Sequence, residues 1–76
     1  MLPGQRLRLK KATLCMEILD GALHGVRIPD GAIVTVRKKQ RIDGERMIDV
    51  LWNGRVVAMF VEDLQARGEE VRDAEA

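Results

Sequence analysis

The chain has 76 residues, of which 13 are Lys or Arg, 12 are Asp or Glu and one is Cys, and its formal net charge is +1. This length fits one small domain, residues 1–76, for which self-association is a common supplement to a limited core. The single Cys excludes an internal disulfide, and no apolar run is long enough to span a membrane. Because no signal peptide is recognisable either, we expect a cytoplasmic protein.

The first predicted strand is Arg6 to Lys10, in which charged and apolar residues alternate. Residues 1–5 are expected to be a loose start, because Pro3-Gly4 interrupts regular structure. The apolar run 12–19 fits either a strand or a helix, and the strand is favoured because everything after it is strand-like. Lys10-Lys11 would then form a bulge or a bend.

Turn-forming residues divide the middle of the chain. Asp20-Gly21 predicts one turn and Pro29-Asp30-Gly31 predicts another. Between them, residues 22–28 are expected to be a short irregular or extended piece, since a glycine interrupts it. Residues 32–39 predict a strand by their β-branched content, and residues 40–45 predict a polar loop.

A hairpin over residues 47–61 is the strongest local signal, because its dipeptide Asn53-Gly54 suits a type I′ turn with positive φ at both central positions. The turn fixes the facing pairs, which are Trp52 with Arg55, Val50 with Val57, and Ile48 with Met59. Alternation then predicts a core face made of Ile48, Val50, Trp52, Arg55, Val57, Met59 and Val61. At the tip, Arg55 beside Trp52 predicts a cation–π pair or a solvated Arg lying over the ring.

The opposite face of this hairpin is unusually apolar for a solvated surface. It carries Asp49 together with five candidate interface residues, which are Met47, Leu51, Val56, Ala58 and Phe60. One interpretation is that another strand or the chain ends cover this face. The other is that the face is a surface for self-association or for a protein partner.

The last part of the chain predicts a short helix and a final strand. Residues 62–67 are expected to form about one helical turn with Leu64 pointing inward, and Gly68 would end it. Residues 69–72 predict a strand that buries Val71, and residues 73–76 are expected to fray. Turn signals thus recur roughly every ten residues, which is typical of an all-β barrel or sandwich.

About five short strands with one helical turn before the last resemble an SH3-like small barrel. The residues that carry this resemblance are 28–36 and 48–71, and the barrel would span residues 12–72. The resemblance implies the fold and little more. SH3 domains that read proline-rich segments use clustered exposed aromatics, whereas this chain has only Trp52 and Phe60, so proline-motif binding does not follow.

Groups that could carry catalysis are scarce, since the chain lacks Ser and Tyr altogether. The single His, His24, is expected in a loop, and Cys15 is expected to be a small buried apolar residue. The two do not form a zinc signature, and the glycines do not form a phosphate-binding pattern. We therefore expect no enzyme activity, no metal and no cofactor.

Charge is unevenly distributed along the chain: residues 1–41 hold nine basic and three acidic side chains, and residues 42–76 hold four and nine. The two halves could attract each other within the fold or between subunits. Alternatively, the basic side chains form a phosphate-binding, salt-sensitive nucleic-acid surface. The candidates for that surface are Arg6, Arg8, Lys10, Lys11, Arg37, Lys38, Lys39 and Arg41. The sequence predicts a protein-interaction or self-association module, with nucleic-acid binding as the alternative.

Overall fold

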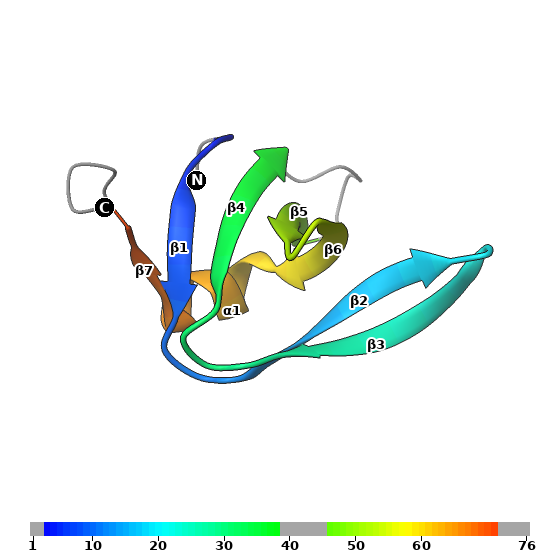
Figure 1. Cartoon of the computed structure of the whole chain (residues 1–76), viewed down its shortest axis with the longest axis horizontal. Coiled ribbons are helices and arrows are strands. Elements are labelled where there is room, and N and C mark those ends of the chain that lie inside the picture. The colour runs from blue at the N-terminus through cyan, green and yellow to red at the C-terminus, as the bar shows by residue number, and fades with distance from the viewer. Residues whose placement is uncertain (1–2, 39–45, 72–76) are drawn as a thin grey trace.

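Antiparallel pairing organises the chain, whose computed structural model describes residues 3–38 and 46–71. The strands and the helix are, in chain order, β1 (Arg6–Leu9), β2 (Thr13–Leu19), β3 (Ala22–Ile28), β4 (Ile33–Lys38), β5 (Met47–Trp52), β6 (Arg55–Phe60), α1 (Val61–Arg67) and β7 (Gly68–Glu70). The strands form one sheet in the order β3-β2-β6-β5-β4-β1-β7 (Figure 1). The all-β prediction is confirmed, with more strands than the five expected.

The β5–β6 hairpin has the predicted register. Asn53 and Gly54 have φ values of 55° and 78°, and the facing pairs run from Trp52 opposite Arg55 to Met47 opposite Phe60. The predicted core face is buried at its centre, at Ile48, Val50, Val57 and Met59. The local turn therefore determines which side of the hairpin meets the core.

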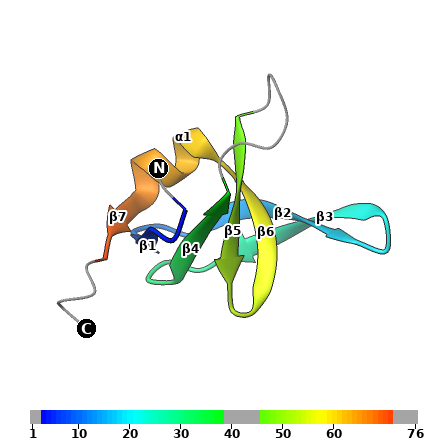
Figure 2. The same ribbon diagram turned by 90° about the horizontal axis from the view of Figure 1, so that it is seen from above.

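A second hairpin, β2–β3, extends away from the other strands (Figures 1 and 2). Residues 13–19 are a strand rather than a helix, and they pair without interruption with residues 22–28. Of the two alternatives expected at residues 22–28, irregular or extended, the structure shows the extended one, and Gly25 does not interrupt it. Asp20 and Gly21 have φ values of 52° and 78°, so a two-residue turn like that at Asn53-Gly54 holds the pairing. Gly25 keeps the strand regular while leaving space beside Leu14.

The core lies on one side of the bent sheet, under α1. It collects side chains from six strands and the helix, and its buried members are Leu7, Leu9, Cys15, Ile28, Val34, Val36, Ile48, Val50, Val57, Met59 and Leu64. The first strand lies between β4 and β7, which joins the start of the chain to its last strand. Lys10 and Lys11 form the expected bend between β1 and β2.

The helix α1 comes directly before the last strand, as predicted, with Leu64 fully buried. Gly68 ends the helix, as expected, but without the positive φ that glycine often adopts at a helix C-terminus. Its backbone is extended, with φ −93° and ψ 143°, and its N–H bonds to the Leu64 carbonyl. A Cβ at this position would lie 2.5 Å from that carbonyl oxygen and 3.0 Å from Leu7 Cδ2. Close approach, and not backbone conformation, requires glycine here. The predicted loop 40–45 and tail 73–76 lie outside the described residues.

Replacing Gly68 with Ala is expected to destabilise the fold by about 1–3 kcal/mol, as overpacking does in a close-packed site. The measurement is the free energy of unfolding in urea. Gly25→Ala is the matched control, because the added Cβ would meet only Leu14 Cδ1, at an ordinary 3.5 Å. Equal stability of the two variants would contradict the close-approach explanation.

Candidate interaction surface

The side of the sheet facing away from the core carries a continuous set of apolar side chains. Register places them on one face, because Met16 of β2 lies opposite Ala58 of β6, and β6 pairs with β5. We call this set the outer apolar face, and it consists of Leu14, Met16, Ile18, Leu23, Met47, Leu51, Val56, Ala58 and Phe60.

Exposure separates this face from an ordinary protein surface. Leu14, Ile18 and Leu23 are 63%, 61% and 64% exposed, and Val56 and Phe60 are close to half exposed. Five of the six large apolar residues that are exposed among the described residues therefore lie on this face, and the sixth, Leu19, points to the other side. These exposures are too large for the described part of the chain to cover the face.

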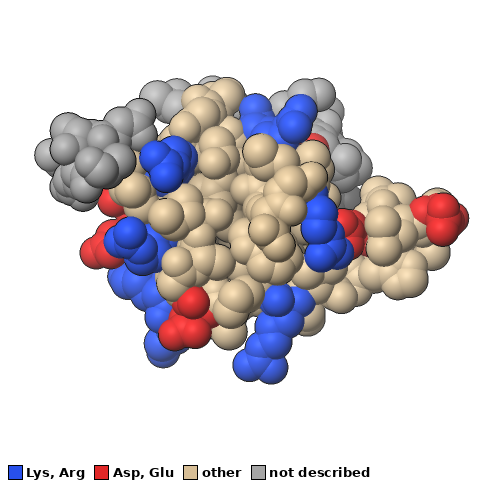
Figure 3. All heavy atoms as spheres, in the orientation of Figure 1, with Lys and Arg blue, Asp and Glu red and all other residues tan. Residues whose placement is uncertain are grey.

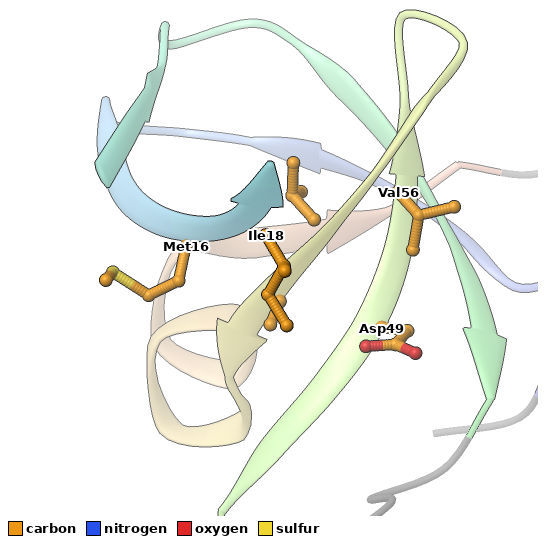
Figure 4. Close-up of a pocket in the computed structure, with 6 residues that line it drawn as sticks. Met16, Ile18, Asp49 and Val56 are labelled. Carbon is orange, nitrogen blue, oxygen red and sulfur yellow. The ribbon is translucent and has the colours of Figure 1, made fainter. Parts of the chain in front are cut away.

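A hollow of about 230 Å³ opens on the outer apolar face where β2 meets the β5–β6 hairpin. Its walls are Met16 and Ile18 on one side and Val56 with Ala58 on the other, with the half-buried Asp49 at its border (Figure 4). The hollow arises because β2 and β6 are paired in register only at Met16 and Ala58. The hollow is thus lined mainly by apolar side chains, and one carboxylate, that of Asp49, lies at its border.

The five interface candidates named from the sequence all lie on this face, at Met47, Leu51, Val56, Ala58 and Phe60. The sequence did not reveal that β2 and β3 enlarge it. The available signal was the alternation in residues 12–19, which places Leu14, Met16 and Ile18 on one side of a strand. Which strand lies next to β2 is a non-local feature that alternation does not show.

On the core side of the same strands, Glu17 and Arg55 form an ion pair with two hydrogen bonds. Arg55 Nε donates to Glu17 Oε2 at 2.9 Å, and Arg55 Nη2 donates to Glu17 Oε1. The hydrogen bonds from Arg55 lower the pKa of the Glu17 carboxyl. Arg55 also lies over Trp52, with its Cζ 5.8 Å from the ring centroid, as the cation–π interpretation predicts. Arg55 thus joins the tip of β5–β6 to β2.

The predicted basic residues are spread over both ends of β1. The antiparallel β1–β4 pairing puts Arg6 and Arg37 toward one end, while Lys10 and Lys11 lie at the other, beside Arg67. Between them, Arg8 faces Glu69 of the acidic strand β7. Blue side chains are accordingly dispersed in Figure 3. The Lys38 side chain and all of Lys39 and Arg41 lie outside the described part of the structure.

Two side chains were considered for chemistry, Cys15 and His24. Cys15 is buried as expected, and burial, with a smaller contribution from Asp63, raises the pKa of its thiol to about 11. Such a thiol stays protonated near neutral pH and is a poor nucleophile. His24 is exposed within β3 and faces Glu17 across the β2–β3 pair, so its expected position in a loop is wrong.

Within residues 3–38 and 46–71, no group of three or more His, Cys, Asp or Glu could hold a metal ion. The same residues contain no helix that is long and apolar enough to cross a membrane. Comparison of the chain with protein-family models, with curated proteins and with solved structures found no match. Its function is therefore inferred from its surfaces.

The Glu17–Arg55 pair predicts a specific loss of stability in acid. Because the folded state lowers the Glu17 pKa below its ordinary 4.5, the pair stabilises the fold above that pH. This stability is lost as the pH falls from there through the folded-state pKa. Glu17→Gln should lower the thermal midpoint at pH 7 and make it less sensitive to acid.

The control for this experiment is Glu62→Gln, since Glu62 meets Arg46 at 3.5 Å in an exposed ion pair. Such surface pairs contribute little to stability. Parallel pH curves for the wild-type protein and Glu17→Gln would show that Glu17 and Arg55 do not stabilise the fold as an ion pair.

Proposed function

We propose that this chain is a non-enzymatic protein-interaction module that self-associates through its outer apolar face. The observation that carries the proposal is the gathering of five large exposed apolar side chains on one side of the sheet. Complete burial of one such side chain contributes roughly 1.5–3 kcal/mol. Covering even their exposed parts therefore provides a substantial driving force for association, and large apolar patches commonly mark interfaces.

The proposal includes an SH3-like barrel as the scaffold. Three features support it: β4, β5 and β6 follow one another as neighbours, α1 precedes β7, and β7 returns to pair with β1. The long β2–β3 hairpin is then an excursion between the first and second barrel strands. The two aromatic residues, Trp52 and Phe60, lie on opposite faces of β5–β6, so the proposal does not include an aromatic groove for proline-rich segments.

Nucleic-acid binding stays a prediction with less support than self-association. Of the basic side chains of β1, Arg8 lies opposite Glu69, and Glu70 lies opposite the neighbouring Leu7. This arrangement fits the interpretation in which the basic and acidic parts of the chain attract each other. Alternation does place Arg6 and Arg8 on one face of β1, as a phosphate-binding surface requires, but Glu69 lies opposite Arg8, and Lys10 and Lys11 lie beyond the end of the strand.

Phe60→Asp tests the proposal on a residue whose replacement spares the fold. Phe60 is 48% exposed and occupies the N-cap of α1 without making a side-chain hydrogen bond. Asp is a preferred N-cap residue, so its capping bond offsets the loss of the buried part of the ring. The variant should keep its thermal midpoint within about 5 °C and associate about tenfold more weakly.

Sedimentation velocity over a concentration series measures this effect. Leu19→Asp is the matched control, because Leu19 is 47% exposed but lies on the other side of the sheet. The control should associate as the wild-type protein does. A folded Phe60→Asp variant with unchanged association would refute the role of the outer apolar face.

A further inference from the structure

The two edges of the sheet differ in length and chemistry. At one edge, β7 has three residues, of which two are Glu. At the other edge, β3 has seven residues, of which five are exposed; it has no Pro, no Lys and no register shift, and its one Lys or Arg residue is Arg27, next to its end. Proteins usually protect long edge strands with such features, because an unprotected edge pairs readily with another strand. Among residues 3–38 and 46–71, no strand pairs with the outer side of β3, which leaves this edge available for strand addition.

The hairpin register identifies the backbone groups that β3 offers. The pair flanking the two-residue turn is Leu19 with Ala22, which is hydrogen-bonded in hairpins of this kind. Because hydrogen-bonded and non-hydrogen-bonded pairs alternate, the even-numbered residues of β3 bond to β2. The N–H and C=O groups of Leu23, Gly25 and Arg27 therefore point away from the sheet, toward solvent.

We propose that β3 pairs antiparallel with β3 of a second copy of this chain, around a two-fold axis at His24. The inference rests on the proposed function, self-association, and adds a contact separate from the outer apolar face. In this register the outward groups of Leu23 in one copy meet those of Gly25 in the other. Edge pairing then joins two copies into one sheet, and the outer apolar face becomes continuous across them.

Side-chain chemistry favours this register and a second copy as the occupant. Leu23 is 64% exposed and would lie opposite Gly25 of the other copy, which has no side chain to obstruct it and lies beside the exposed Leu14. Arg27 would lie next to the turn residue Asp20 of the other copy, which places opposite charges together. The β2–β3 hairpin thus supplies its own complement: Leu23 lies against Gly25 within the strand, and Arg27 lies opposite the turn residue Gly21, next to Asp20.

Gly25→Pro tests the pairing at its centre. Proline removes the outward N–H of residue 25 and leaves the β2–β3 hydrogen bonds in place, since Gly25 faces Met16 in a non-hydrogen-bonded pair. Proline is tolerated on an edge strand when the lost N–H faces solvent. Gly25→Ala is the matched control, because it adds a side chain and retains the N–H. Gly25→Pro should keep its circular dichroism spectrum and lose edge pairing, whereas Gly25→Ala should keep both.

Amide hydrogen exchange gives a readout that packing of the outer apolar face does not change. On association, the N–H groups of Leu23, Gly25 and Arg27 should become protected, and Ala22, His24 and Val26 should change little. The protection should rise with protein concentration in the wild-type protein and persist in Phe60→Asp. It should be absent from Leu23 and Arg27 in Gly25→Pro.

The outcomes separate the two proposals. Edge pairing would be overturned if Gly25→Pro left association unchanged and if the N–H groups of Leu23 and Arg27 stayed unprotected from exchange in the associated wild-type protein. The role of the outer apolar face would then stand. If Gly25→Pro weakens association and Phe60→Asp leaves it unchanged, the role of the outer apolar face is overturned and edge pairing stands. A wild-type chain that stays monomeric throughout the concentration series would overturn both.

Discussion

Two tight turns with positive φ determine which side chains meet the core. Asp20-Gly21 and Asn53-Gly54 each close a hairpin with a two-residue loop, and a shift of one residue in either would exchange the two faces of its strands. Because β2 lies beside β6, the two registers together decide the composition of both faces of the sheet. The core and the outer apolar face are therefore consequences of the same constraint.

This constraint gives β2 an unusual distribution of side chains. Thr13, Cys15 and Glu17 are buried, while the apolar residues of the same strand, Leu14 and Ile18, are exposed. The buried polar groups are satisfied: the Thr13 hydroxyl donates to the Lys11 carbonyl at 3.0 Å, and Glu17 accepts from Arg55. A strand that buries polar side chains and exposes apolar ones supports the proposed association through its outer side.

Local features of this fold were predictable from the sequence, and non-local ones were not. The register of β5–β6 follows from one dipeptide, and the inward position of Leu64 follows from helical spacing before Gly68. The Glu17–Arg55 pair joins residues 38 positions apart, and no spacing rule connects them. The outer apolar face was predicted only at β5 and β6, because the sequence did not show that β2 lies beside β6. Residues 22–28 were expected to be irregular or extended, and the sequence left the choice open because Gly25 suggested an interruption that the pairing with β2 does not show.

A dilution series followed by amide chemical shifts tests the central claim, that the chain makes its contacts through the outer apolar face and the β3 edge. We expect shifts that depend on concentration to cluster in β2, β3 and β6, at Leu14–Ile18, Leu23–Arg27 and Val56–Phe60. The strands β1 and β7, at the opposite edge of the sheet, should show little change. Changes confined to the basic side of β1 and β4, or shifts that do not change on dilution, would contradict the account.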